Sequence, residues 1–160
     1  MKNPETFETG CCPRFNPKSW DNKEITFKDK LFLKDHVNSL FHIPLNFGAV
    51  MERGIKKIEA AHAVASEQLV LSDETSLWGA DVYIAVDKEV PKAHMEKISG
   101  TFLTKVFEGS YRNMGKNVEE MKTYVKSKGK DVKKLYFYYT YCPKCAEAYG
   151  KNYTVILAQV

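Results

Sequence analysis

The amino-acid sequence predicts an α+β fold in which duplicated β-α-β-β units form an antiparallel sheet. Two main helices are expected on one face of this sheet, with a cleft between the repeats. Apolar residues recur every three or four positions in two segments, 47–63 and 111–126, as on the buried face of an amphipathic helix. Segments of alternating or apolar residues flank both helices. The order strand, helix, strand, strand therefore occurs twice.

Length and composition are those of one globular domain. The chain has 160 residues, of which 44% are hydrophobic and 28% are charged, which is ordinary for a soluble protein. No apolar run approaches the roughly 18 residues of a membrane span, and the N-terminus lacks the apolar core of a signal peptide. We therefore expect a cytoplasmic protein with no membrane partner.

The net charge of +4 does not indicate a nucleic-acid-binding protein. The densest group of lysines falls between residues 122 and 134, where Glu119, Glu120 and Asp131 are interleaved with them. A mixture of both signs at helical spacing is typical of a solvated helix face. No DNA-reading motif is present, so no direct nucleic-acid contact is expected.

The first half begins with an irregular arm at residues 1–24, which contains three prolines and one glycine. Residues 25–43 are rich in apolar and β-branched side chains and are expected to be extended, with a turn near 28–30 that divides them into two strands. Asn46 is a capping residue at the start of the helix 47–63. The apolar positions of this helix that are expected to face the protein core are Phe47, Val50, Met51, Ile55, Ile58 and Ala61.

Two further strands complete the first repeat. Residues 68–72 and 80–86 are expected to pair across a turn at 73–76. The segment 87–97 holds Pro91 and several charges and is the expected linker between repeats. The predicted organisation is therefore an arm, 1–24, followed by a single domain, 25–160. Its parts are repeat one (25–86), the linker (87–97) and repeat two (98–160).

The second repeat follows the same order. A strand at 98–108 is followed by a turn at Gly109 and Ser110, and a helix at 111–126 that Gly129 ends. An aromatic strand, Leu135–Tyr141, is expected to form a hairpin with the closing strand 152–160.

Short sequence matches support the duplication. Asn46–Gly48 aligns with Asn113–Gly115 at the start of each helix, and Asp81–Val86 aligns with Asn152–Leu157 in the last strand of each repeat. The second repeat is longer, and its additional residues fall in the second hairpin turn.

Aromatic residues occupy both faces of the strand Leu135–Tyr141. A tyrosine buries an apolar ring but needs a partner for its hydroxyl, so a row of tyrosines suits a ligand of mixed polarity. The alternative is a sheet face with solvated hydroxyls. The residues expected to bind a ligand are Trp78, Tyr83, Tyr136, Tyr138 and Tyr139.

Two motifs carry a resemblance to a known family. Phe107-Glu-Gly-Ser-Tyr111 enters the second helix, and Trp78-Gly-Ala-Asp-Val-Tyr-Ile-Ala-Val86 forms a hairpin ending in an apolar strand. With the duplication, they make the chain resemble the GyrI-like small-molecule-binding domains over residues 25–160. The resemblance implies an aromatic-lined ligand cleft between the repeats. The family's usual buried glutamate is missing here, because Leu135–Tyr141 contains no acid.

Two functions follow from this resemblance. The first is a free-standing protein that binds an amphipathic or aromatic small molecule in an aromatic-lined cleft. No DNA-binding segment accompanies the domain, so a regulator of this kind would need a partner protein. The alternative is a hydrolase that acts on reactive, strained-ring electrophiles in the same cleft, as some relatives do with a glutamate and a tyrosine. Whether the chain is an enzyme is left open at this point.

Glu108 and Tyr111 are the residues expected to carry such catalysis. They flank the turn at Gly109, so a carboxylate and a phenol could face one cleft. A carboxylate enclosed by aromatic rings can act as general acid or base near neutral pH. The alternative for Glu108 is a surface residue that the dipole of the following helix favours.

Other catalytic machinery is not indicated. His36, His42, His62 and His94 are scattered, without metal-ligand spacing or a Ser/Asp partner pattern, and are expected to be structural. No glycine-rich phosphate loop or nucleophile elbow occurs, so no nucleotide or organic cofactor is expected.

The four cysteines lie in two close pairs, Cys11 with Cys12, and Cys142 with Cys145. Four thiolates would complete a tetrahedral structural zinc site that fastens the N-terminal arm to the second hairpin. Adjacent cysteines seldom reach one ion together, so unbound thiols are an alternative. A redox or disulfide role is a third alternative. The expected position of Cys142 and Cys145 in a turn disfavours redox chemistry, and a reducing cytosol disfavours a disulfide.

Overall fold

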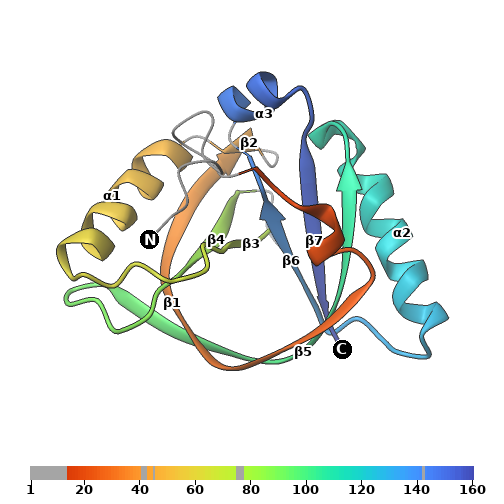
Figure 1. The fold of residues 1–160 in the computed structure, drawn as a ribbon, viewed down its shortest axis with the longest axis horizontal. Helices are drawn as coiled ribbons and strands as arrows, with labels where there is room; N and C mark the ends of the chain where they lie inside the picture. The colour runs from red at the N-terminus through yellow and green to blue at the C-terminus, as the bar shows by residue number, and fades with distance from the viewer. Residues whose placement is uncertain (1–13, 41–42, 45, 75–77, 142) are drawn as a thin grey trace. The chain divides into compact units, whose positions relative to one another are not determined.

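The structure is a computed structural model that describes residues 14–40, 43–44, 46–74, 78–141 and 143–160. Within these ranges the chain is a mixed α+β protein with antiparallel strand pairs and three α-helices (Figure 1). It divides into two compact units, residues 26–100 and residues 101–160 with the described part of 1–25. The strands β1 (Lys23–Leu40) and β5 (His94–Glu108) each begin in one unit and end in the other.

The 26–100 unit is a small antiparallel sheet with one helix. Besides most of β1, it contains β2 (Ile43–Pro44), α1 (Phe47–Ala60), β3 (Val70–Asp73) and β4 (Gly79–Ala85). The central strand is β4, which pairs antiparallel with β1 and with β3. The helix α1 covers one face, and the apolar core between them includes Leu33, Val37, Val50, Ile58, Val82 and Ile84.

The helix α1 begins where the sequence predicts and ends three residues earlier than predicted. Asn46 is its N-cap, but its side chain accepts a hydrogen bond from the backbone N–H of Asn38 at 2.7 Å, not from the first turn of the helix. Phe47 and Ile55 were expected in the core and are each 42% exposed. The buried stripe runs instead through Val50, Gly54 and Ile58, so Gly54 takes the place at the sheet that the pattern gave to Ile55.

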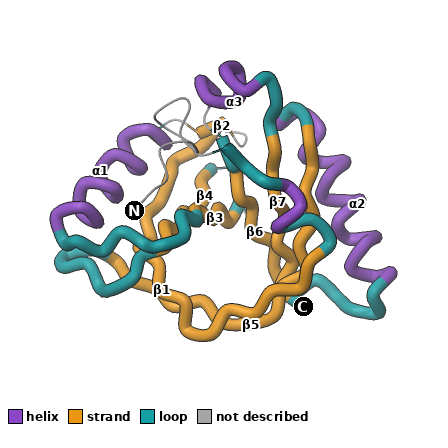
Figure 2. The backbone as a smooth tube through the Cα atoms, in the orientation of Figure 1, coloured by secondary structure: helices purple, strands orange, loops and turns teal. Residues whose placement is uncertain are grey.

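The 101–160 unit also combines antiparallel strands with α-helices. It contains the end of β5, the 3₁₀ turn η3 (Tyr111–Asn113), α2 (Met114–Ser127), β6 (Lys134–Tyr139), α3 (Pro143–Tyr149) and β7 (Tyr153–Gln159). Here β7 is the central strand, antiparallel to β5 and to β6. Figure 2 shows α2 alongside these strands. The core beneath it includes Leu103, Phe107, Met121, Val125, Phe137, Ile156 and Ala158.

Two predicted turns are wrong. The chain at residues 28–30 does not divide β1, which is continuous from Lys23 to Leu40. Asp29 alone adopts a positive φ of 48°, and its N–H donates to the Ser99 hydroxyl at 2.8 Å. The turn predicted between β6 and β7 contains the short helix α3, which begins at Pro143. Proline is favourable at the first helical position because its missing N–H would have no partner there.

The described part of the N-terminal arm is anchored to the 101–160 unit. It contains a 3₁₀ turn, η2 (Pro17–Ser19). The Thr104 hydroxyl donates to the carbonyl of Trp20, and the N–H of Val106 donates to Asp21 Oδ1 at 3.0 Å. The N–H of Phe15 donates to the Tyr141 hydroxyl at 2.7 Å. In the ranges described, no helix is both long enough and apolar enough to cross a membrane.

Candidate functional site

A row of three polar side chains crosses the sheet of the 26–100 unit on the face opposite α1. Side chains alternate along a strand, so the neighbours of Leu33 and Val37 on β1 face away from the helix. The strand register places His36 directly opposite Asp81, and Asp81 directly opposite Asp73. We call His36, Asp81 and Asp73 the polar row.

His36 and Asp81 are in direct contact. The Nδ1 atom of His36 lies 3.0 Å from Oδ1 of Asp81, and the two side chains are 57% and 35% exposed. Burial raises the pKa of Asp81, but the hydrogen bond from His36 and the charge of Lys34 outweigh it, so the pKa lies below its usual value. The ionised carboxylate can only accept a hydrogen bond. The proton therefore sits on Nδ1, and a neutral imidazole keeps a lone pair on Nε2.

Lys34 places a positive charge beside the polar row. Its Nζ atom lies 3.1 Å from Oε2 of Glu96 and 3.6 Å from Oδ2 of Asp81, and 5.4 Å from the centre of the Tyr83 ring. The hydrogen bond to Glu96 raises the pKa of Lys34, and the nearby Tyr83 and Asp81 add to this against the opposing effect of burial. The ammonium is therefore charged throughout the neutral range.

Gly79 makes room for the imidazole. A Cβ atom at this position would lie 2.4 Å from Nε2 and 2.6 Å from Cε1 of His36, and 3.1 Å from the carbonyl oxygen of Val37. Any side chain here would overlap the ring in its present position, so the ring would have to move. The preceding residue, Trp78, is 60% exposed, while Asp73 at the far end of the polar row is only 7% exposed.

The aromatic residues predicted to bind a ligand are divided between the two units. Tyr83 is 2% exposed and packs edge-on against Phe32. In the 101–160 unit, Tyr136 packs against Phe102, and Tyr138 contacts Phe15 and Trp20 of the arm.

Tyr139 faces the other side of its strand. It stacks on Phe137, with ring centres 6.3 Å apart, and packs into the core beneath α2. Tyr138 and Tyr139 therefore point to opposite faces of the sheet and cannot line one surface of it together.

Glu108 does not lie in the aromatic environment that was expected for it. This residue ends β5 and is exposed, so aromatic rings do not enclose its carboxylate as the catalytic interpretation required. Its position matches the alternative, a surface glutamate close to the start of a helix. Tyr111 begins η3, two residues after Gly109. A catalytic role for Glu108 and Tyr111 stays a prediction.

The predicted zinc site lies largely outside the described residues. Cys11, Cys12 and Cys142 fall there, while Cys145 is fully buried in α3. Cys145 therefore lies in a short helix and not in a hairpin turn. Among the residues that are described, no three His, Cys, Asp or Glu side chains are arranged to hold a metal ion. The four-cysteine site stays a prediction.

The contact between His36 and Asp81 was missed by reasoning from the sequence. The two residues lie 45 positions apart, and His36 was expected to be structural because no acidic or hydroxyl partner was evident. The signal that could have found it is strand register. Once the extended segment 25–43 pairs antiparallel with residues 80–86, alternation places both side chains on the face that the helix leaves uncovered.

Fold and site together define an α+β protein that presents a histidine–carboxylate pair on an antiparallel sheet. Residues 2–160 match the family model described as Bacterial hydrolase, and the chain belongs to that family. No curated protein matches it.

Solved structures from Listeria innocua have a similar fold. Two are hydrolases, each 11% identical to this chain, with TM-scores of 0.58 and 0.60. The matches cover 86% and 88% of this chain and 90% and 93% of theirs. A third, described as an uncharacterized conserved protein, is 10% identical, with a TM-score of 0.62 and coverage of 88% and 93%. At such identities the likeness establishes the fold alone.

Proposed function

We propose that this protein is a hydrolase in which His36 acts as the general base toward water and Asp81 orients it. The observation that carries the proposal is the 3.0 Å contact between His36 Nδ1 and Asp81 Oδ1. This contact leaves Nε2 as the basic atom of a side chain that is 57% exposed. Membership of the bacterial hydrolase family supports hydrolysis over binding alone.

The reaction needs one base and one stabilised anion. Nε2 of His36 takes a proton from water as the water oxygen attacks an electrophilic carbon of the substrate. The bond from that carbon to the leaving oxygen breaks, and the leaving oxygen takes a proton from the imidazolium. Asp81 acts as a positioning residue, because its carboxylate fixes the tautomer of the ring and stabilises the imidazolium that forms.

Two neighbours complete the proposed site. The Lys34 ammonium, 3.6 Å from Asp81 Oδ2, favours negative charge on the oxygen that leaves. Asp73 supplies a second carboxylate on the same row, and it is buried. A buried polar group of this kind is suited to fix the orientation of a substrate hydroxyl or amide.

The substrate class is a small molecule with an electrophilic carbon bonded to oxygen, such as an ester, a lactone or an epoxide. Epoxides belong in this class because the GyrI-like domains that the sequence resembles include hydrolases of strained rings. The exposed indole of Trp78 adjoins Gly79, on which the His36 ring packs. It offers an apolar surface for the body of such a substrate.

A substrate panel tests the proposal. Aryl esters, lactones and aryl epoxides are screened for thermal stabilisation of the protein, and each compound that stabilises is incubated in water enriched in heavy oxygen. We expect at least one product that carries a single labelled oxygen. Ligands that stabilise the protein and are all recovered unchanged would overturn the proposal in favour of a protein that only binds.

A further inference from the structure

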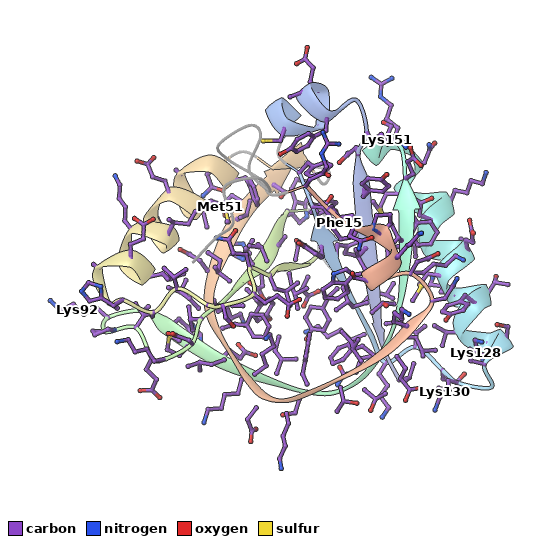
Figure 3. The ribbon with its side chains drawn as sticks, viewed as in Figure 1. Phe15, Met51, Lys92, Lys128, Lys130 and Lys151 are labelled. Carbon is purple, nitrogen blue, oxygen red and sulfur yellow. The ribbon has the colours of Figure 1, made fainter. Side chains whose placement is uncertain are left out.

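A pocket on the 101–160 unit shares no residue with the polar row. Its volume is about 290 Å³, and it is lined by Asn22, Lys23, Glu24, Leu103, Tyr124, Lys128 and Lys130. These residues come from the start of β1, from β5, and from the end of α2 with the turn that follows. Figure 3 shows Lys128 and Lys130 at this end of α2. We call it the lysine pocket.

Charge in the lysine pocket is strongly one-sided. Three ammonium groups line it against the single carboxylate of Glu24. Across the described ranges, none of Lys23, Lys128 and Lys130 takes part in an ion pair. Two other lysines of α2 do, since Lys122 pairs with Glu119 and Lys126 pairs with Asp131. Like other unpaired lysines of the described surface, the three that line the pocket thus keep charges that no carboxylate contact neutralises.

The dipole of α2 does not account for this arrangement. A helix C-terminus favours basic side chains within its last turn, which explains Lys126 and Lys128. Lys23 is contributed by β1, and Lys130 follows the turn at Gly129, whose φ is +72°. The N–H of Lys130 donates to the carbonyl of Val125 at 3.3 Å. Backbone geometry thus brings cations from two distant segments to one pocket.

The pocket also has apolar and aromatic lining. Leu103 is 4% exposed, and Lys105 and Lys128 hold their Nζ atoms 5.3 Å and 5.6 Å from the centre of the Tyr124 ring. Burial raises the pKa of Tyr124, and the negative charge of Asp21 raises it further, so its phenol stays protonated and can donate. The lining therefore combines cations and a neutral donor with apolar surface.

We propose that the lysine pocket binds a small organic anion in which one phosphate or carboxylate group is joined to a compact aromatic or apolar body. The ammonium groups and the phenol would contact the anionic group by charge-assisted hydrogen bonds, and Leu103 would contact the body. A volume of about 290 Å³ is at the small end of ligand-site volumes, which suits a ligand with a single ring.

Titration with phenyl phosphate tests this proposal, with inorganic phosphate and benzyl alcohol as comparison probes. Binding is followed by the NMR signals of the Leu103 methyl groups and the Tyr124 ring. We expect saturable shifts with phenyl phosphate that weaken as salt is added. The double variant Lys128→Gln/Lys130→Gln should bind about tenfold more weakly, because two charge-assisted contacts at a partly exposed site are lost.

The control is Lys116→Gln/Lys122→Gln, which removes two exposed charges from α2 outside the pocket and should leave binding unchanged. Thermal unfolding of both double variants checks that the fold is retained. Equal weakening in the two variants would show diffuse attraction to a basic surface and overturn the proposal. So would the absence of saturable shifts. Binding of inorganic phosphate or benzyl alcohol as tight as that of phenyl phosphate would also overturn it, because the proposal requires both parts of the ligand.

Discussion

The Nδ1 atom of His36 lies 3.0 Å from Oδ1 of Asp81, although 45 positions separate the two residues in the chain. They are directly opposite partners in the pairing of β1 with β4. The backbone of the sheet thus holds both residues, so the contact does not depend on a mobile loop. If His36 is the proposed base, this backbone anchoring reduces the conformational entropy lost when substrate binds.

Replacing Gly79 by alanine should separate this pair. The new Cβ would overlap the imidazole, at 2.4 Å from Nε2, and would lie 3.1 Å from the carbonyl oxygen of Val37, so the ring has to move. We expect the nitrogen signals of the His36 ring to shift and hydrolysis to slow by at least about tenfold, since the base is misplaced. Gly115→Ala is the control, because nothing lies within 4 Å of a Cβ there. Ring signals in Gly79→Ala identical to those of the unmodified protein would contradict the packing described.

The elements themselves could largely be predicted from the sequence. Periodicity located α1 and α2, and the strands β3, β4, β6 and β7 lie within two residues of their predicted bounds. Local patterns failed where a contact distant in sequence decides the structure. Ser99 holds the backbone at Asp29, so β1 does not break there. Ile55 is exposed because Gly54 is the residue that meets Leu33 and Ile84.

The candidate site could be predicted only in part. Tyr83 and Trp78 were predicted to bind a ligand because of their aromatic character, which stays a prediction, and the structure places both in the unit that carries the polar row. His36 and Asp81 were not identified, because each is ordinary in its local sequence and only register joins them. A shift of the β1–β4 register by one residue would turn His36 to the face that α1 covers.

Asp35 should stabilise the fold near neutral pH and lose this effect in acid. Its Oδ2 atom accepts from Arg53 Nε at 3.1 Å and from Nη2 at 2.7 Å. Burial raises the pKa of Asp35, but Arg53 and the N–H of His36 together lower it below its usual value. Because the pKa of Asp35 is lower in the folded state, its ionised form stabilises the folded protein at pH values above the unfolded-state pKa of about 4. This stabilisation disappears as the pH falls through the folded-state pKa.

Urea unfolding of Asp35→Asn at several pH values measures this contribution. We expect the variant to be less stable at neutral pH by about 1 kcal/mol, and the difference to shrink below pH of about 4. Glu52→Gln serves as control, because its ion pair with Lys56 is well exposed and should contribute little at any pH. A difference for Asp35→Asn that is constant with pH would contradict the assignment.

Two glycines of α1 should respond differently to the same substitution. A Cβ at Gly48 meets nothing within 4 Å, whereas at Gly54 it would lie 2.9 Å from Cδ1 of Ile84. We expect Gly48→Ala to stabilise the protein by about 0.5–1 kcal/mol through helix propensity. In Gly54→Ala, crowding of the core should destabilise the protein by about 1–3 kcal/mol, which cancels or exceeds that gain. Equal effects in thermal unfolding would show that α1 is not closest to the sheet at Gly54.

Tyr141→Phe should loosen the N-terminal arm. The Tyr141 hydroxyl accepts the N–H of Phe15 at 2.7 Å, and its loss leaves a partly buried donor unsatisfied at a cost of about 1 kcal/mol. Hydrogen exchange at the Phe15 amide should accelerate accordingly. Tyr153→Phe removes a hydroxyl from a ring that contacts both Phe15 and Tyr141 and should leave this exchange unchanged. Equal acceleration in the two variants would assign the effect to the aromatic cluster as a whole.

The most direct test of the proposed hydrolase is the rate constant kcat/KM of His36→Gln on the best substrate of the panel. Glutamine keeps a polar side chain of similar reach but cannot accept a proton from water. We expect kcat/KM to fall by at least about 100-fold relative to the unmodified protein, the usual contribution of a general base. Glu108→Gln, measured in parallel, should retain full activity. Unchanged hydrolysis in His36→Gln, with loss of activity in Glu108→Gln, would contradict the account and move the chemistry to the end of β5.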